Sequence, residues 1–566
     1  MREQDSNGAL TVRAIAGSHV VILGMSVRAD ARSGLMGFAI KRLDKASGEE
    51  RTLPNFLLLE VNDKGADSDH SSWLNPLQSF QWSDFDAIPG RAYTYTVTAM
   101  EGSPGALTSG DSVALEIETE GGDGAEHAVF FNRGPAGWQA YEREFGQLDP
   151  DQVPDRAAYR WLSRGLEEAL LAFIAQAEGK GWGLRVAMFE FEYMPVLDAL
   201  WSAQQRGVDV KAVVDERPTG NGPRVENEAA IALARFEDKT CIPRAHTSHT
   251  PHNKFVVLLH EGEPQQVWTG STNWTKGGIF GHSNVGHLVR EKDVAAEYLE
   301  YWNELSGDPE HKDLAKWVVE KNGEPERRDA ASGDEVLPPK GSVGTVFSPR
   351  RKAAALDWYA RLLKGAEHSA FLTCPFNVSQ EFQDVFAEDS ESLRYLILNG
   401  EDGETVAVAR KIEGDPLNQV AIGAYIGKGN WHQWLEEHLT GYNQHAKFIH
   451  TKYLLIDPLG DDPIVVTGSA NFSTTSTEGN DENMLVIRGD KAVADVYLGE
   501  FMRLFTAFRL RDKAKVKAGQ KAPGSGVDTA EAGNVHLAAD PSWADGAYVA
   551  DSKLEKERLL FSGAIA

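Results

Sequence analysis

Apolar and polar positions alternate along the first 120 residues of the chain. Between residues 93 and 99 the alternation is strict, so one face of that strand is expected to be buried. Gly, Asp, Ser and Pro separate the apolar runs, as turn residues do between short strands. The pattern predicts strands at residues 10–16, 19–27, 35–43, 80–85, 91–100 and 112–120. Short strands at this spacing indicate a β-sandwich.

Beyond this region, strands alternate with helices in two similar series. The first series predicts a helix at 159–177, a strand at 184–191, a helix at 195–206 and a strand at 208–214. The second predicts a helix at 353–363, a strand at 369–376, a helix at 379–386 and a strand at 393–398. Each series closes on an apolar strand, at 284–290 and 482–488. Such alternation is typical of an α/β layer with a largely parallel sheet.

These patterns divide the chain into five parts. A polar stretch with Pro and Gly, residues 320–342, separates the two α/β series and reads as a linker. The tail carries enough apolar residues to fold back onto the body. The predicted parts are a β-sandwich at 1–125, a first α/β half at 126–319, the linker, a second α/β half at 343–512 and the tail at 513–566.

One motif occurs in both halves with the same internal spacing. Its histidine, lysine, serine and asparagine are His252, Lys254, Ser271 and Asn273 in the first copy and His450, Lys452, Ser469 and Asn471 in the second. In each copy 21 residues separate the histidine from the asparagine, and the two copies lie 198 residues apart. Identical spacing of this kind indicates an internal duplication.

The duplicated residues can form a site for a phosphodiester. Histidine and lysine two residues apart on a strand project from the same face. Two halves placed face to face therefore offer two imidazoles, two ammonium groups and two amides to one point. The lysines and asparagines can hold the non-bridging oxygens, one histidine can attack phosphorus, and the other can protonate the leaving oxygen and later activate water. Because the lysines supply the positive charge, no metal and no other cofactor is required.

The duplicated HxK and GSxN motifs resemble those of the phospholipase D superfamily over roughly residues 130–510. The resemblance implies two pseudo-symmetric α/β halves that share one active site, a covalent phosphohistidine intermediate and no metal. It does not define the substrate, because members cut phospholipids, DNA, RNA or tyrosyl-DNA links, and some make cardiolipin. The first region resembles a fibronectin type III domain, with Tyr93 or Tyr95 as the corner tyrosine.

The two copies differ where the family motif continues to an aspartate. The second copy has Asp457 there, whereas the first has Leu259. The second copy also contains Glu482 in an Asn-Asp-Glu segment that resembles the family's NxE motif, whose carboxylate orients a histidine. The first-copy segment that we align with it, Asn284-Val285-Gly286, has no carboxylate. In this asymmetry the chain resembles tyrosyl-DNA phosphodiesterases, whose first motif also lacks the aspartate.

This difference predicts unequal roles for the two histidines. We expect a carboxylate beside His450 and a neutral partner, such as Ser283 or Asn284, beside His252. A neighbouring carboxylate raises the pKa of a histidine and favours its protonated form. The pattern therefore favours His450 as the general acid and His252 as the nucleophile, with Asp457 and Glu482 among the catalytic groups.

Four further residues are candidates for contact with substrate. Ser271 and Ser469 are small and polar, and they can donate to phosphate or cap the turn that follows. Trp431 and Trp434 lie in an insertion before the second motif. Aromatic side chains there can stack on bases, touch acyl chains or belong to the core.

Composition and charge narrow the class of protein. The chain has 566 residues, of which 42% are hydrophobic and 25% charged, as in globular proteins. Its net charge of -27 argues against an electrostatic grip of the whole protein on nucleic acid or anionic lipid, although a local basic groove remains compatible with it. The two cysteines, the polar start and the lack of a long apolar stretch predict a cytoplasmic protein without a membrane span.

Three functions compete. The first is a phospholipase D-type enzyme that removes or exchanges a phospholipid head group, with peripheral contact to a membrane. The second is a nuclease or end-processing phosphodiesterase that acts on single-stranded or end-exposed nucleic acid. The third is a phosphate-binding protein without catalytic activity. Only Leu259 and Gly286, which stand where the motif would have carboxylates, favour this function. Since one chain holds both copies of the motif, no oligomer is required to complete the site.

Overall fold

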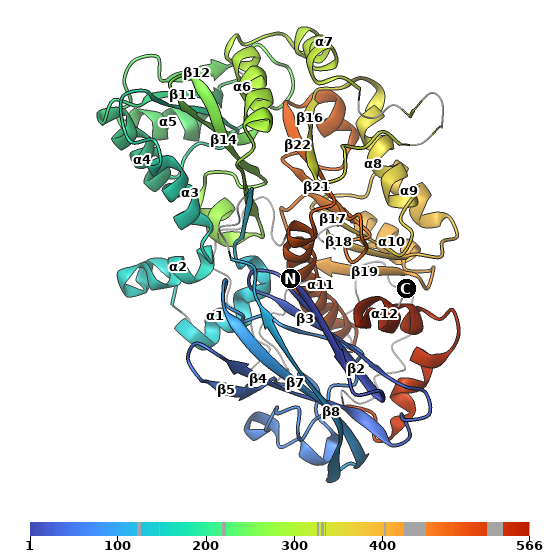
Figure 1. The fold of residues 1–566 in the computed structure, drawn as a ribbon. Helices are drawn as coiled ribbons and strands as arrows, with labels where there is room; N and C mark the ends of the chain where they lie inside the picture. The colour runs from blue at the N-terminus through green and yellow to red at the C-terminus, as the bar shows by residue number, and fades with distance from the viewer. Residues whose placement is uncertain are drawn as a thin grey trace.

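The beginning of the chain forms two antiparallel four-stranded sheets that share a core (Figure 1). Their strand orders are β1-β2-β3-β6 and β5-β4-β7-β8. The strands are β1 (Arg2–Ser6), β2 (Leu10–Ala16), β3 (Val21–Val27), β4 (Leu35–Asp44), β5 (Glu50–Thr52), β6 (Gln81–Asp84), β7 (Ala92–Ser103) and β8 (Ala106–Glu118). All six predicted strands coincide with observed ones. Two were missed, because β1 is polar and largely exposed and β5 has only three residues.

Alternate side chains of β7 fill the core of this sandwich. Tyr93 and Tyr95 are both fully buried. The backbone N–H of Ile88 donates a hydrogen bond of 2.9 Å to Oη of Tyr93, and Tyr95 donates one of 2.9 Å to the carboxylate of Asp84. A tyrosine bonded to the backbone a few residues upstream is the corner arrangement known from immunoglobulin-like sandwiches. The fibronectin type III assignment stays a prediction.

The computed structural model describes residues 1–564 except 122–125, 147, 218–221, 325–327, 330–332, 334, 401–402, 424–448 and 518–535. After the sandwich come two α/β halves, each with a seven-stranded sheet. The first sheet has the order β12-β11-β10-β13-β14-β15-β9, and the second has the matching order β19-β18-β17-β20-β21-β22-β16. The two halves are therefore structural repeats as well as sequence repeats.

The sheets are mixed, so the prediction of largely parallel sheets was wrong. In the first half β10 (Trp182–Met188), β11 (Asp209–Asp215) and β12 (Cys241–Arg244) are parallel, and the other pairs are antiparallel. Only two residues join β13 (Lys254–His260) to β14 (Glu263–Gly270). A parallel crossover needs a dozen residues or more, so this connection must be a hairpin. The remaining strands of the first sheet are β15 (Val285–Val289) and β9 (His127–Phe131).

The second sheet repeats this arrangement with similar strand lengths. Its strands are β16 (Ser342–Ser348), β17 (Ser369–Cys374), β18 (Leu393–Asn399), β19 (Asn418–Gly423), β20 (Tyr453–Ile456), β21 (Ile464–Gly468) and β22 (Glu482–Arg488). Again only the three strands that alternate with helices, β17, β18 and β19, are parallel.

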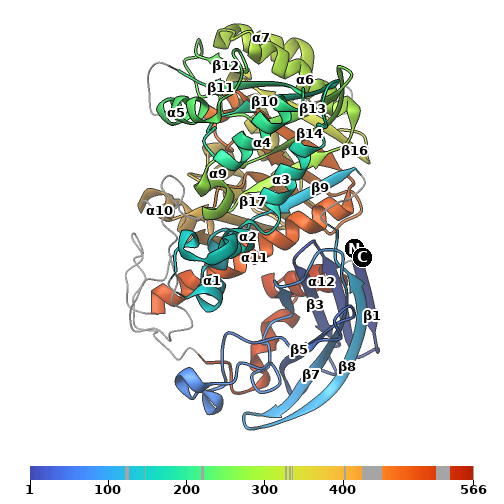
Figure 2. The ribbon, with the colours of Figure 1, turned by 90° about the vertical axis from the view of Figure 1, so that its left-hand side faces the viewer.

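Helices cover both faces of each sheet (Figures 1 and 2). In α6 (Lys292–Ser306) and α11 (Lys491–Lys517), buried side chains join residues of both sheets in one shared core. The other helices are α1 (Trp138–Phe145), α2 (Ala157–Ser163), α3 (Leu166–Ala175), α4 (Met194–Gln205), α5 (Arg224–Ala234), α7 (His311–Asn322), α8 (Ala354–Lys364), α9 (Gln380–Ala387), α10 (Gly403–Ile412) and α12 (Lys553–Ser562). The single helix predicted at 159–177 is two helices, because Arg164 and Gly165 adopt positive φ angles of 53° and 95°.

The strands that carry the motif are buried on both faces. Phe255 and Val257 of β13 point into the shared core between the sheets, whereas Val256 points into the outer core of the first half. A strand that is covered on both faces has a continuous run of apolar residues in its sequence. Such a run follows each of the two HxK motifs. The polar residues at the start of β13 and β20 are thereby held at the ends of rigid strands.

The tail packs against the sandwich and the second half. Helix α12 contacts β3 and β18, and Figure 2 shows it beside the N-terminal sheets. Upstream of it, the ring of Trp543 stacks on Phe80 at 5.1 Å between centroids. None of the helices in the described part of the chain has an apolar stretch long enough to cross a membrane. The cellular location and the division at residues 125, 319, 342 and 512 stay predictions.

Candidate active site

Each motif histidine is held by the opposite half of the chain. His252 directly precedes the strand β13, and its Nδ1 lies 2.9 Å from both carboxylate oxygens of Glu482 at the start of β22. Its backbone N–H donates to the carbonyl oxygen of Asp481 at 2.9 Å. Two bonds to adjacent residues of the second half thus fix both the backbone and the ring of His252.

His450 is held in the same way by the first half. Its Nδ1 lies 3.0 Å from Oδ1 of Asn284 and 3.1 Å from the carbonyl oxygen of Ser271. Its backbone N–H donates to the carbonyl oxygen of Ser283 at 3.0 Å. Since both partners of the ring are acceptors, Nδ1 carries the hydrogen and Nε2 is the atom left for chemistry.

The expected pairing of histidines and partners was therefore wrong. The carboxylate of Glu482 lies beside His252, and the amide of Asn284 lies beside His450. The partners cross because the two halves face each other, so the start of each closing strand reaches the histidine of the other half. The alignment of the first copy was also displaced by two residues. Shifting Glu482 by the repeat distance leads to Asn284 and not to Gly286.

The two motif serines orient these crossing partners. Ser469 donates a hydrogen bond of 2.7 Å to Glu482, and Ser271 donates one of 2.8 Å to Oδ1 of Asn284. Both serines are fully buried. Both hydroxyl groups are thus bonded to the residues that contact the histidines, and the prediction that the serines contact substrate stays a prediction.

The two lysines follow their histidines by two residues: Lys254 is the first residue of β13, and Lys452 lies one residue before β20. Nζ of Lys254 donates to the carbonyl oxygen of His252 at 2.7 Å, and Nζ of Lys452 donates to that of His450 at 2.6 Å. Both lysines are buried. Burial lowers the pKa of Lys254 to about 8 and lowers the pKa of Lys452 well below its ordinary value. An anion between them would restore the charged forms.

Burial also controls the charge of the histidines. It lowers the pKa of His252 to about 4, although Glu482 opposes the shift. It lowers the pKa of His450 well below the ordinary value, and the charge of Lys452 adds to the effect. Despite its own burial, Glu482 has a pKa below the usual range because His252 and Lys254 lie beside it. At neutral pH these shifts favour a carboxylate and two neutral rings, one of which can act as a nucleophile.

Equivalent asparagines complete the two copies, and the asparagine of the first half has a carboxylate neighbour. Nδ2 of Asn273 donates to Glu190, which follows β10. Within the described residues, Oδ1 of Asn273 and Oδ1 of Asn471 are buried and have no hydrogen-bond partner. The chain after each asparagine forms a π-helical turn, at Gly277–Gly281 and Thr475–Gly479. Glu190 was missed from the sequence because it belongs to no motif.

Asp457 lies away from the histidines and lysines, so the prediction that it is a catalytic residue was wrong. It follows β20, whereas His450 precedes this strand; at about 3.3 Å per residue, the seven steps from His450 to Asp457 span up to about 23 Å. The carboxylate of Asp457 accepts hydrogen bonds from the backbone N–H groups of Glu367, His368 and Ser369. It therefore caps the entry to β17. Trp431 and Trp434 lie outside the described residues.

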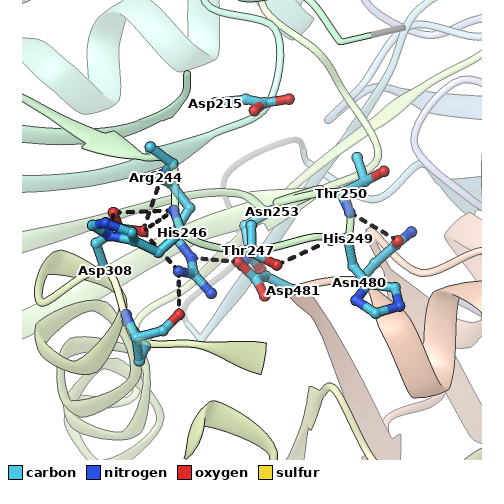
Figure 3. Close-up of polar contacts among 12 residues, drawn as sticks. Asp215, Arg244, His246, Thr247, His249, Thr250, Asn253, Asp308, Asn480 and Asp481 are labelled. Carbon is cyan, nitrogen blue, oxygen red and sulfur yellow. Dashed lines mark hydrogen bonds and ion pairs between the residues drawn. The ribbon is translucent and has the colours of Figure 1, made fainter. Parts of the chain in front are cut away.

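A buried ion pair joins the halves next to the site (Figure 3). Arg244, the last residue of β12, donates to Asp481 at 2.9 Å and to Asp308 at 2.8 Å. Arg244 and Asp481 are both fully buried. Because Asp481 precedes Glu482 and accepts the backbone bond of His252, this ion pair supports the contact between those two residues. Spacing within one half gives no indication of it.

The comparisons with known proteins agree with this geometry. The family model described as "Cardiolipin synthase, PLD-like domain" matches the chain twice, at residues 170–306 and 362–505. Each match includes the histidine, lysine, serine and asparagine of one half. The chain therefore has two phospholipase D-like α/β halves. Phospholipase D-like enzymes cleave phosphodiesters. The match therefore confirms the predicted enzyme class, a phosphoric diester hydrolase.

Several solved structures of phospholipase D-like and other proteins are similar to the chain. A phosphatidylserine synthase from Haemophilus influenzae Rd KW20 is 13% identical, with a TM-score of 0.44 over 64% of this chain and 93% of that one. Nuc from Salmonella typhimurium, a phospholipase D family member, is 26% identical, with a TM-score of 0.20 over 25% and 87%. A mutant yeast tyrosyl-DNA phosphodiesterase is 11% identical, with a TM-score of 0.34 over 64% and 90%. Among curated proteins none matches the chain.

Proposed function

We propose that the chain is a metal-independent phosphodiesterase of phospholipase D type, which cleaves a phospholipid head group through a phosphohistidine intermediate. The observation that supports this proposal is the crossed pairing of His252 with Glu482 and of His450 with Asn284. In each ring Nδ1 is occupied by its partner from the opposite half. Both Nε2 atoms are then left to act on one substrate. Lys254 and Lys452 supply the positive charge for the phosphate oxygens, so the chemistry needs no metal.

In the first step Nε2 of His252 attacks phosphorus, and the bond from phosphorus to the leaving oxygen breaks. For this step His450 takes up a second proton, at Nε2, when the anionic substrate binds, because a negative charge beside the ring raises its pKa. It then gives this proton to the leaving oxygen, so the head group leaves as a neutral alcohol. The ring of His252 becomes positively charged when its nitrogen binds phosphorus. The carboxylate of Glu482 at Nδ1 stabilises that charge, which favours His252 as the nucleophile.

In the second step His450, now neutral, acts as a general base. It takes a proton from water or from an acceptor alcohol, whose oxygen attacks phosphorus as the bond to His252 breaks. Water yields hydrolysis and an alcohol yields transphosphatidylation. The neutral partner of His450, Asn284, suits a ring that must lose and regain a proton in each cycle.

Charge favours a phospholipid over nucleic acid as the substrate. The net charge of the chain is -27, and a carboxylate, Glu190, is bonded to Asn273 within the site. A nucleic acid brings a further phosphate on each side of the scissile one, whereas a phospholipid can bring a single negative charge. Like charges close together in a site of low polarity repel strongly.

The test is phosphorus NMR on the full chain mixed with phospholipid vesicles and a short single-stranded oligonucleotide. His252→Ala serves as the matched control, because it removes the proposed nucleophile. Loss of a lipid diester signal with the wild type, and not with His252→Ala, is the expected result. New nucleotide monoester signals would establish the nuclease alternative instead. If both substrates stayed intact, a phosphate-binding protein without activity would be the better description.

A further inference from the structure

A carboxylate lies among the groups that would hold the phosphate. Oε2 of Glu190 accepts a hydrogen bond of 2.5 Å from Nδ2 of Asn273. The backbone fixes this neighbourhood. The N–H of Trp274 donates to the carbonyl oxygen of Glu190 at 3.0 Å, and the N–H of Glu192 donates to the carbonyl oxygen of Trp274 at 3.0 Å. Glu190 is therefore held beside Asn273 by main-chain pairing as well as by its side chain.

Glu190 also acts on the lysines of both halves. Burial lowers the pKa of Lys254 and of Lys452, and Glu190, together with Glu482, opposes the shift in both. The carboxylate therefore lies within electrostatic reach of both lysines, in addition to its hydrogen bond with Asn273. There it repels an anionic substrate, unless the substrate brings a hydrogen donor or a positive charge to it.

The corresponding position of the second half holds an aromatic ring. β10 and β17 pair in the same register with the equivalent strands β13 and β20, and in this register Glu190 corresponds to Phe376. Phe376 is 48% exposed, so its ring is open to contact with a ligand. The two halves thus differ at this position of the repeat: one has a carboxylate and the other an apolar ring.

We propose that Glu190 is a specificity-determining residue, which selects phosphodiesters whose head group carries ammonium or hydroxyl hydrogens. This inference rests on the proposed phospholipase function and names the class of head group that the site accepts. A carboxylate only accepts hydrogen bonds, so it recognises ammonium and hydroxyl groups alike. Phe376 offers contact to the apolar remainder of the lipid.

The test compares kcat/KM on three lipids that differ only in the head group. Phosphatidylethanolamine brings an ammonium group, phosphatidylglycerol brings hydroxyl groups, and phosphatidylmethanol brings no donor. Glu190→Gln is measured beside Glu226→Gln, which removes an exposed charge from the same half. For Glu190→Gln we expect a loss of about 10- to 100-fold on the donor-bearing lipids, as for a bond to a charged group, and less than about 3-fold on phosphatidylmethanol. For Glu226→Gln we expect changes below about 3-fold on all three.

The outcomes separate this inference from the function on which it rests. A loss confined to phosphatidylethanolamine or to phosphatidylglycerol supports the proposal and identifies the donor as ammonium or hydroxyl. An equal loss on all three lipids overturns it, because Glu190 would then only orient Asn273. If the wild type cleaved the oligonucleotide and no lipid, or formed no phosphohistidine with any substrate, the proposed function itself would fail, and this inference with it.

Discussion

The two α/β halves have the same strand order and the same motif, yet they differ at the residue that crosses to the opposite histidine. The second half sends the carboxylate of Glu482 to His252, and the first half sends the amide of Asn284 to His450. Around these residues the supporting bonds are equivalent, since a buried serine donates to each partner. Duplication thus builds a symmetric frame, and one substitution within it can divide the roles of two identical side chains.

The sharpest way to test this division is to remove each histidine in turn. We expect His252→Ala to lose about 10⁴-fold or more in kcat and to form no covalent intermediate, because the nucleophile is gone. We expect His450→Ala to lose about 10²–10⁴-fold with a natural head group, since the general acid is gone. With a phosphatidyl-p-nitrophenol substrate, whose leaving group needs no proton, His450→Ala should instead accumulate a phosphorylated protein.

The measurement is intact-protein mass spectrometry after rapid mixing, with peptide mapping of the modified residue. A covalent adduct on His252 in the His450→Ala variant is the expected result. An adduct on His450 in the His252→Ala variant would reverse the two roles and contradict the argument from Glu482.

A second, smaller effect is expected when the halves are made alike. Glu482→Gln replaces the carboxylate by an amide, so both rings would then have neutral partners. Loss of a preorganised group that stabilises charge in the transition state typically costs about 10²–10³-fold in kcat, and we expect a loss in this range. Glu478→Gln, on the adjacent π-helical turn, is the charge-matched control. Equal and small changes in the two variants would show that the asymmetry has no role in catalysis.

Within one half the sequence was sufficient for most strands and for the motif residues. The apolar runs predicted the buried strands, and the spacing of HxK and GSxN predicted which side chains belong to the motif. Partners that cross between halves, such as Glu482 with His252, could not be read from spacing, because spacing says nothing about how two repeats face each other. The repeat distance of 198 residues would have identified Asn284 as the equivalent of Glu482. Glu190 left no such signal, since tertiary contacts with Asn273 and Trp274 bring it to the site.

The dependence of activity on pH tests the lysines of the two halves. Lys254 has a pKa of about 8, so it is charged below this pH and loses its charge as the pH rises further. Because kcat/KM reports the free enzyme, we expect the loss of this charge to add a fall of about 10-fold per pH unit above about pH 8. In Lys254→Arg this fall should move to higher pH, since a guanidinium stays charged. A fall at the same pH in both proteins would assign it to another group.

The smallest effect on activity is expected for a substitution of Asp457. The first half has Leu259 at the equivalent position, and we expect this difference to have no effect on catalysis. The carboxylate of Asp457 accepts three backbone N–H groups before β17, and the residue's φ angle of 44° is one that asparagine tolerates. Asp457→Asn should therefore keep the backbone, leave some of these donors unpaired and lower the free energy of unfolding by about 1–3 kcal/mol. Urea unfolding measures that loss, and kcat of the folded protein should stay within about 2-fold. A large loss of kcat at unchanged stability would show that Asp457 does have a role in catalysis. If only stability falls, the aspartate that follows the second HxK motif serves the fold, and Leu259 in the first half is no sign of a degraded site.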